Sequence, residues 1–279
     1  MKWNTPGTLL LALLIMIGIS SCQKVISVDL NQSSPQLVIE GLVNDRGTID
    51  SVNINMTGNY FTPSLKFPPV TGALVTISDD LGDMDTLSET SPGNYYSPGP
   101  KGVPGRTYSL RVIENGKEFD ALSTMPQEVT IDSFYYEVTP QIFGQTGYSF
   151  YLTFRDPPQP GNYYRIIPHI SSIPQDSIGG GRGGFQILDD KLTNGNEITY
   201  RFSVRSEIGN ELQSGDTVSV DLECIDKSTY DYYSTLRDII AADQSPTSLS
   251  PANPNTNLTN QALGYFSAYT IDTRSLILK

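Results

Sequence analysis

The chain has 279 residues and a formal net charge of −12, from 30 acidic and 18 basic side chains. This excess of negative charge repels nucleic acid and anionic lipid headgroups, so neither is an expected partner. Tyrosine, glycine and proline are frequent, with 16, 24 and 19 residues. Because short alternating runs accompany them, the composition favours strands and turns over helices. We therefore expect an all-β protein.

The first 21 residues have the features of a secretory signal peptide. Lys2 precedes an uncharged run, Leu9–Ile19, which is shorter than the roughly 20 residues that a membrane span needs. Small residues and a cysteine follow as Ile19-Ser20-Ser21-Cys22, the pattern of a bacterial lipoprotein box. We predict that residues 1–21 are removed and that Cys22 is acylated. The alternative is a plain secretory signal with its cleavage site elsewhere.

Acylation of Cys22 predicts attachment to a membrane by lipid. Each buried methylene contributes about 0.8 kcal/mol, and two or more acyl chains anchor a protein stably where one chain does not. Loss of Lys2 with the signal changes the side-chain charge from −12 to −13. We expect residues 22–36, which are rich in polar side chains, to form a tether at the outer membrane. The sequence leaves open whether the protein faces the periplasm or the cell surface.

Two β-rich domains are predicted after the tether, although one large β domain would also fit the 258 residues left after removal of 21. About seven short strands fit within residues 37–124, and Asn115-Gly116 predicts a type I′ hairpin turn. This spacing is typical of a β-sandwich. The segments 69–77 and 102–108 resemble immunoglobulin-like or transthyretin-like modules, and residues 125–129 are a predicted hinge.

The predicted second domain, residues 125–279, combines strands with a single helix. Further strands are expected at 148–155, 163–167, 185–188, 197–204, 217–225, 263–269 and 276–278. In one of them Val218, Val220, Leu222 and Cys224 share a face, which predicts a buried Cys224 thiol. A capping-box pattern, Ser228-Thr229-Tyr230-Asp231, predicts a packed helix at about 229–241. The Pro-, Asn-, Ser- and Thr-rich stretch 242–260 is expected to be a long surface loop.

Several motifs together resemble one protein family. They are the lipoprotein box, Leu37-Val38-Ile39-Glu40-Gly41, Asp156-Pro157, Asn162-Tyr163-Tyr164-Arg165, Gly215-Asp216 before Val218, Tyr232-Tyr233 and Gly264-Tyr265-Phe266. Over nearly the whole mature chain, the sequence resembles Bacteroidota lipoproteins of domain of unknown function 4249 (DUF4249). The resemblance implies a surface or periplasmic partner of a TonB-dependent outer-membrane receptor. It supplies no catalytic residues and no cofactor.

Patterns for catalysis and metal binding are weak. His169 is the only histidine, and without a nucleophile elbow it gives hydrolase chemistry little support. Four aspartates, Asp79, Asp80, Asp83 and Asp85, offer oxygen ligands for calcium but lack the EF-hand order. The carboxylate pair of a glycoside hydrolase has no local signature among 30 acidic residues. We predict a protein that is not an enzyme and has no metal site.

A Gly-rich run and several tyrosine doublets are the candidate contact residues. The run Gly179, Gly180, Gly181, Arg182, Gly183 and Gly184 matches Gly-x-Gly-x-x-Gly, but the strand predicted after it excludes a βαβ nucleotide site. The run is predicted to be a mobile loop, or alternatively a lid or partner-binding loop. The doublets are Tyr95-Tyr96, Tyr135-Tyr136, Tyr163-Tyr164 and Tyr232-Tyr233, and on a strand one member faces outward.

Exposed tyrosine rings stack on sugars or line protein interfaces, unless they are present only because tyrosine favours strands. We predict that Tyr163, Tyr164 and the Gly-rich run contact a TonB-dependent receptor or a small-molecule or glycan ligand. The predicted function is that of a non-catalytic accessory in nutrient uptake. The alternatives are a structural or adhesive envelope lipoprotein and a carbohydrate-active enzyme.

Overall fold

The computed structural model describes residues 34–47, 50–58, 67–98, 101–140, 146–173, 184–204, 212–243 and 253–279. Cys22, the predicted signal peptide, the tether up to residue 33 and Gly179–Gly183 lie outside these ranges. Within them the chain is all-β with one packed helix, as predicted. No helix among the described residues is both long and apolar enough to cross a membrane.

Among the described residues between 37 and 124 there are seven strands, the number that the sequence predicts. They are β1 (Leu37–Asn44), β2 (Asp50–Met56), β3 (Leu74–Asp79), β4 (Met84–Ser91), β5 (Asn94–Ser97), β6 (Thr107–Glu114) and β7 (Lys117–Thr124). The turn between β6 and β7 has φ of 47° at Asn115 and 76° at Gly116. Both values are positive, which confirms the predicted hairpin.

The rest of the chain adds further strands and the helix. They are β8 (Ile131–Pro140), β9 (Thr146–Arg155), β10 (Tyr163–Ile170), β11 (Gln186–Asp189), β12 (Glu197–Val204), β13 (Thr217–Ile225), α2 (Lys227–Asp243) and β14 (Leu263–Ile277). The two strands predicted at the C-terminal end are one continuous strand, β14. The predicted helix is confirmed and extends two residues further at each end.

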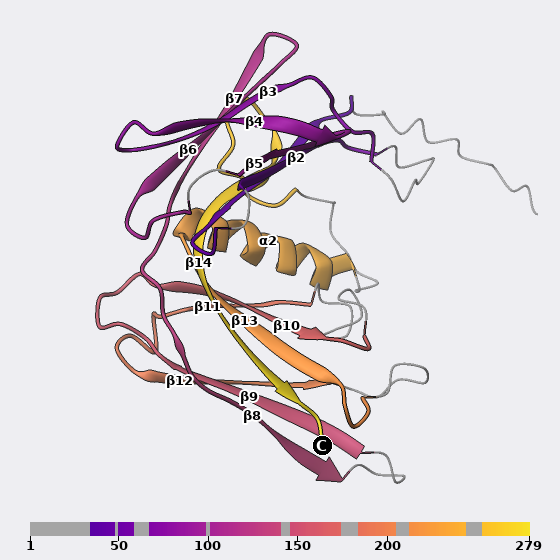
Figure 1. Cartoon of the computed structure of the whole chain (residues 1–279), viewed down its shortest axis with the longest axis vertical. Coiled ribbons are helices and arrows are strands. Elements are labelled where there is room, and N and C mark those ends of the chain that lie inside the picture. The colour runs from indigo at the N-terminus through magenta and orange to yellow at the C-terminus, as the bar shows by residue number, and fades with distance from the viewer. Residues whose placement is uncertain are drawn as a thin grey trace, which may run out of the picture. The chain divides into compact units, whose positions relative to one another are not determined.

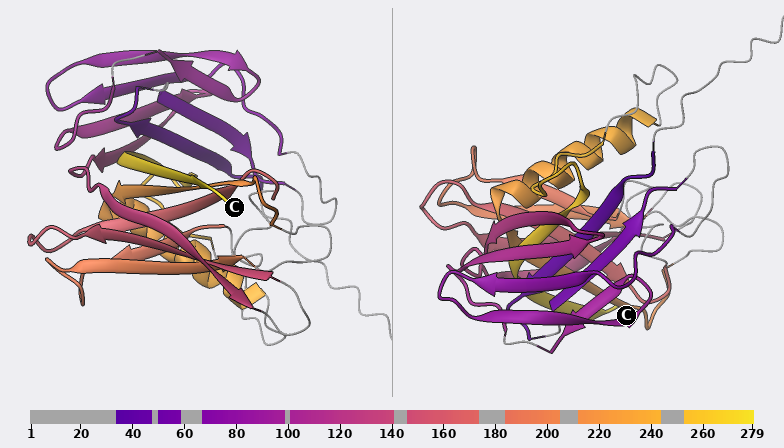
Figure 2. Two further views of the ribbon diagram at one scale, coloured as in Figure 1. Left: turned by 60° about the horizontal axis from the view of Figure 1, so that its bottom comes forward. Right: turned by 90° about the horizontal axis from the view of Figure 1, so that it is seen from above.

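Strand β14 joins the two halves of the chain. An eleven-stranded sheet has the order β11-β10-β13-β14-β1-β2-β5-β4-β3-β6-β7, and a second sheet has the order β12-β9-β8. The first part of β14 pairs in parallel with β1, and its second part pairs antiparallel with β13. In Figure 2 the yellow β14 accordingly runs between the violet strands of the first half and the orange strands of the second.

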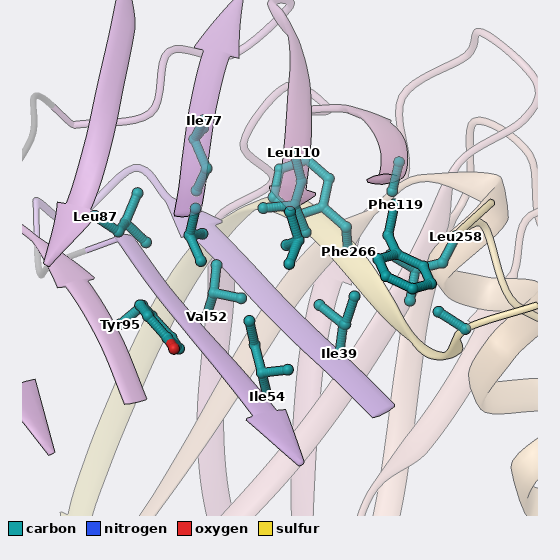
Figure 3. Packing of buried hydrophobic residues seen from close by; sticks show 14 of the residues in the cluster. Ile39, Val52, Ile54, Ile77, Leu87, Tyr95, Leu110, Phe119, Leu258 and Phe266 are labelled. Carbon is teal, nitrogen blue, oxygen red and sulfur yellow. The ribbon is translucent and has the colours of Figure 1, made fainter. Parts of the chain in front are cut away.

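The first hydrophobic core lies among β1 to β7 and the start of β14. Side chains from all of these strands contribute, as Figure 3 shows for Ile39, Val52, Ile54, Ile77, Leu87, Tyr95, Leu110, Phe119 and Phe266. Leu258, from the predicted surface loop, also packs here. A part of that loop is therefore core, contrary to its polar composition.

Residues 257–260 cover the open edge of β7. The Asn257 amide donates to the carbonyl of Leu122 at 3.0 Å and to that of Phe266 at 2.8 Å, and its oxygen accepts from the amide of Phe266 at 3.0 Å. Thr259 exchanges two bonds with the Asp120 backbone. These side chains replace a neighbouring strand, because an uncovered edge would leave backbone groups unpaired.

The second core lies between the three-stranded sheet and β10, β13 and the end of β14. Phe150, Leu152 and Phe154 point inward along β9, as their alternation predicts, and so does Cys224 on β13. Helix α2 covers the opposite face of the larger sheet, where Tyr232, Tyr233 and Leu236 pack against Ile187 and Tyr265 (Figure 1). This part of the sheet is buried on both faces.

The two cores do not follow the predicted boundary between residues 124 and 125. Met125, in the predicted hinge, is buried in the first core. Residues 258–268 were expected in the second domain, yet Leu258, Ala262, Phe266 and Ala268 also belong to the first core. Residues 35–279 group into a single compact unit. Whether each half is a domain in its own right stays a prediction.

Candidate functional site

Tyr163 and Tyr164 point to opposite faces of β10, as expected for a doublet. Tyr164 is fully buried in the second core, and its hydroxyl donates to the Asp156 carboxylate. Tyr163 is half-buried, and its ring centroid lies 4.9 Å from that of Tyr230 on α2. The outward ring of this doublet is thus held against the helix. A role for either residue in binding stays a prediction.

Both tyrosines line a cavity of about 250 Å³ near the start of α2. Cys224 lies on its wall, and burial raises the pKa of this thiol to about 11. The thiol therefore remains protonated at neutral pH and is a poor nucleophile. Cys224 therefore gives this cavity no activated thiol for covalent catalysis.

Asp226 forms another part of the cavity wall and caps α2. Its carboxylate accepts from the backbone amide of Thr229 at 2.8 Å, the position expected of an N-cap. It also accepts from the Ser123 hydroxyl at 2.8 Å and from the Thr124 amide at 3.3 Å. The predicted capping box at Ser228 is therefore wrong, and Asp226 both starts the helix and fastens it to the end of β7.

Most of the Gly-rich run, including Arg182, lies outside the described residues. Gly184 alone is described; it is a buried turn residue with φ of 68°, followed by β11. The strand predicted after the run is confirmed. Because a strand and not a helix follows, the nucleotide-site interpretation remains excluded.

A group of charged and aromatic side chains, all buried except Glu40 at its exposed margin, lies between α2 and the larger sheet. We call it the Arg165 cluster, and it comprises Glu40, Arg165, Glu223, Tyr232, Tyr233 and Tyr265. Arg165 and Glu223, from neighbouring β10 and β13, form a buried ion pair. The guanidinium carbon of Arg165 also lies 4.3 Å from the centre of the Tyr233 ring. The cation is thus held by a carboxylate and by an aromatic face.

The tyrosines of the cluster are linked to one another. The Tyr233 hydroxyl donates to that of Tyr265 at 2.5 Å, and the rings of Tyr232 and Tyr265 are 4.5 Å apart. Burial raises the pKa of all three hydroxyls, although Arg165 opposes the shift at Tyr233 and Tyr265. They stay neutral at physiological pH, so none of them can act as a general base.

Charge balance within the cluster depends on Arg165. Burial alone lowers the pKa of its guanidinium, but the nearby Glu223 carboxylate outweighs this effect, and the pKa lies well above the usual value. The Glu40 carboxyl, still exposed to solvent, has a raised pKa because desolvation outweighs its attraction to Arg165. The arrangement fixes a permanent cation between the helix and the sheet, which suits a structural or positioning role.

The motifs that carry the family resemblance meet in this cluster. Glu40, Arg165, Tyr232, Tyr233 and Tyr265 come from four separate motifs of the sequence. Two of these motifs pair directly, because Ile39, Glu40 and Gly41 on β1 face Gly264, Tyr265 and Phe266 on β14. Gly264 has φ of 95°, and a Cβ there would lie 2.0 Å from the Ile39 carbonyl oxygen. Only glycine fits at this position.

Three of the four aspartates that offer oxygen ligands for calcium, Asp79, Asp83 and Asp85, line a groove of about 770 Å³ in the first half. Asp79 accepts the amides of Leu81 and Asp83, each at 3.0 Å, and pairs with Arg106. Burial disfavours its ionised form, but these bonds together lower its pKa. These bonds show that the Asp79 carboxylate holds the turn between β3 and β4. Among the described residues, no three His, Cys, Asp or Glu side chains come together as metal ligands.

His169 lies half-buried on β10 beside Asp221 of β13. Its Nε2 atom is 2.7 Å from the Asp221 carboxylate, whose other oxygen accepts from the Thr273 hydroxyl at 2.6 Å. Among the described residues no hydroxyl hydrogen-bonds to His169. The pair resembles half of a catalytic triad, but the nucleophile that such a triad requires is not bonded to the imidazole.

Sequence reasoning missed the buried partners Arg165 and Glu223. Arg165 is part of a family motif, whereas Glu223 is in a strand predicted mainly from its apolar alternation.

Comparison with known protein families gives one match. The model described as Domain of unknown function (DUF4249) matches residues 23–275. No curated protein matches the chain.

Proposed function

The chain belongs to the DUF4249 family, and on this basis we propose that it is an outer-membrane lipoprotein that acts as a non-catalytic accessory of a TonB-dependent receptor. In this role the protein is attached through acylated Cys22 and binds the receptor during nutrient uptake. The proposed partner class comes from the family resemblance.

The observation that carries the proposal is where the family match begins. It starts at Gln23, directly after Cys22 of the predicted lipoprotein box, and continues to residue 275. The family module thus follows the proposed acylation site without an intervening domain. An anchor at that residue would keep the whole module close to the membrane, where a receptor would be within reach.

The chemistry of the described side chains supports a binding role over an enzymatic one. The buried Cys224 thiol and the clustered tyrosines have raised pKa values and are protonated at neutral pH. The Arg165 cation is neutralised by Glu223. These groups stabilise the packing of α2 and supply no activated nucleophile.

Membrane fractionation tests the anchor. The variant Cys22→Ala should leave the membrane fraction and become soluble, because the hydrophobic stretch before it is too short to span a bilayer. A matched control, Cys224→Ala, removes the other cysteine and should stay on the membrane. Retention of Cys22→Ala after a high-salt wash without detergent would contradict the lipid anchor.

Affinity purification tests the partner. The tagged lipoprotein, solubilised from outer membranes, should recover a TonB-dependent receptor in stoichiometric amount. Deletion of the gene should lower uptake of the nutrient that this receptor carries. Recovery of the protein alone, together with unchanged uptake in the deletion strain, would instead favour a structural or adhesive envelope protein.

A further inference from the structure

The three-stranded sheet carries an ordered set of polar and aromatic side chains on its outer face, the face that points away from the second core. Cross-strand register places Tyr135, Tyr151 and Arg201 in one row over β8, β9 and β12. Ser133, Thr153 and Thr199 form the next row on one side, and Glu137, Ser149 and Ser203 form the next on the other. In Figure 1 these strands lie beyond β10 and β13, on the side remote from α2.

The central row is a continuous stack. The Tyr135 and Tyr151 rings are 5.0 Å apart and within 12° of parallel, and the Arg201 guanidinium lies 5.8 Å from the Tyr151 ring centre. Tyr151 also donates its hydroxyl to Glu137 at 3.0 Å, and Arg201 donates to Ser149 at 2.9 Å. These bonds fix Tyr151 and Arg201, while Tyr135, on the edge strand β8, remains 45 % exposed.

The flanking rows consist mainly of hydroxyl groups. Thr153 and Thr199 lie within hydrogen-bonding distance at 3.2 Å, as do Ser149 and Ser203 at 3.3 Å. Ser133, Thr199 and Ser203 are exposed. Neighbouring rows are about 7 Å apart and neighbouring strands about 4.8 Å apart. A ligand on this face would therefore meet hydroxyl donors and acceptors on both sides of the ring stack.

The registered rows of this face carry no net charge, in a chain of net charge −12; the exposed Asp132, in the bulge before Ser133, lies outside these rows. The registered rows hold two carboxylates, Glu137 and Glu197, and two guanidiniums, Arg155 and Arg201. Arg155 lies 3.9 Å from Glu197, and Arg201 and Glu137 contact Tyr151 from opposite sides. The balance of charge favours a neutral ligand over an anion or a cation.

We propose that the Tyr135–Tyr151–Arg201 row is a binding site for a neutral glycan. One pyranose ring stacks on the exposed ring of Tyr135, and neighbouring sugar units of the same chain hydrogen-bond to the exposed serines and threonines of the flanking rows. Because this binding involves the purified protein and sugar alone, it does not depend on the proposed receptor. We therefore place the carbohydrate contact on β8, β9 and β12 instead of on Tyr163 and Tyr164.

A glycan fits this face better than a protein does. Protein interfaces bury a central apolar core inside a polar rim. Here the aromatic row is flanked by hydroxyls, and Leu152, Phe154 and Phe202 of the same strands point inward to the second core. The outer face offers an aromatic ring among hydrogen-bonding groups. A sugar matches it, because a pyranose has an apolar ring face surrounded by hydroxyl groups.

Calorimetry tests the site with the full acylated protein in a non-glycosidic detergent. The neutral probes are cellohexaose, maltohexaose, laminarihexaose and mannohexaose, and the charged probe is hexagalacturonate. At least one neutral hexasaccharide should bind. Tyr135→Ala should weaken this binding at least tenfold, whereas Tyr135→Phe should retain it because the ring is kept. The control Tyr96→Ala, on β5 of the first half, should bind like the unmodified protein.

Thr199→Ala provides a second test that leaves the rings in place, and it should weaken the same binding several-fold. Thermal melting of each variant shows that it is folded. The proposal is overturned if no neutral probe binds, if only hexagalacturonate binds, or if binding survives both Tyr135→Ala and Thr199→Ala. Receptor recovery by the Tyr135→Ala variant separates failure of this site from failure of the proposed receptor partnership.

Discussion

At the scale of single residues, the buried Arg165–Glu223 pair should dominate the stability of the helix-covered face. Arg165→Met would leave the Glu223 carboxylate buried without its cation and should cost about 3–5 kcal/mol of unfolding free energy. Adding Glu223→Gln should restore most of the loss. Urea denaturation measures both. Arg155→Met, in the exposed pair with Glu197, is the control and should cost no more than about 1 kcal/mol. Equal effects at Arg165 and Arg155 would contradict this assignment.

Glu40 should give the cluster a pH-dependent contribution. Its carboxyl pKa is raised in the folded state, chiefly by desolvation, so the folded protein holds this proton more tightly than the unfolded chain. The associated stability is present below the ordinary glutamate pKa and is lost as the pH rises through that value towards the folded pKa. Glu40→Gln should therefore melt at a slightly higher temperature than the unmodified protein at pH 7, with the difference shrinking near pH 4. A lower melting temperature at pH 7 would show that attraction to Arg165 outweighs desolvation.

The residue scale also shows where sequence alternation stops being informative. It predicted that one member of each tyrosine doublet faces outward, and Tyr163 and Tyr135 do lie on the outward side of their strands. The prediction is wrong for Tyr232 and Tyr233, which lie on α2 and are both buried. It could not foresee that α2 would cover Tyr163 while Tyr135 stayed exposed, because that difference depends on which element packs over each sheet. Cys224 was predicted correctly because its burial follows from its own strand.

At the scale of elements, the start of α2 separates two hypotheses about its cap. Asp226→Ala should destabilise the protein by about 1–2 kcal/mol, because it removes the bond to the Thr229 amide and the links to Ser123 and Thr124 of β7. Ser228→Ala should have a much smaller effect, since the Ser228 hydroxyl bonds to Asp226 itself. Chemical denaturation of both variants decides the matter. A larger loss at Ser228 than at Asp226 would restore the capping box predicted from the sequence.

Element types were predictable because their signals are local. The β6–β7 hairpin, the alternation of β9 and the apolar stripe of α2 each occupy one continuous stretch of sequence. The segment 257–260, which covers the edge of β7, was not predictable. Its Asn and Thr residues are typical of a loop, and only the structure shows that they bond to β7 and β14. The same holds for β14, whose two parts have different partners and were predicted as two strands.

At the scale of the whole molecule, β14 makes each half depend on the other. The chain's last strand contributes Phe266 and Ala268 to the first core and completes the sheet against β13 in the second. From strand spacing, the sequence could indicate a β-sandwich followed by a second β-rich domain. It could not indicate that they share a strand, because the pairing of β14 with β1 joins residues separated by more than 200 positions.

This shared strand predicts coupled unfolding of the two halves. Thr270 is fully buried where β14 passes from β1 to β13, and Thr270→Pro would remove a backbone donor there. We expect a loss of at least about 2 kcal/mol, from one backbone hydrogen bond and one buried carbonyl left unpaired. Hydrogen exchange should then show faster opening of β6 in the first half and of β9 in the second to a similar extent. The control, Ser275→Pro, lies in the exposed end of β14, beyond its pairing with β1. It should speed the hydrogen exchange of β9 and leave that of β6 unchanged. If Thr270→Pro, like the control, leaves the hydrogen exchange of β6 unchanged, the halves unfold independently. The prediction of two separate domains is then the better description.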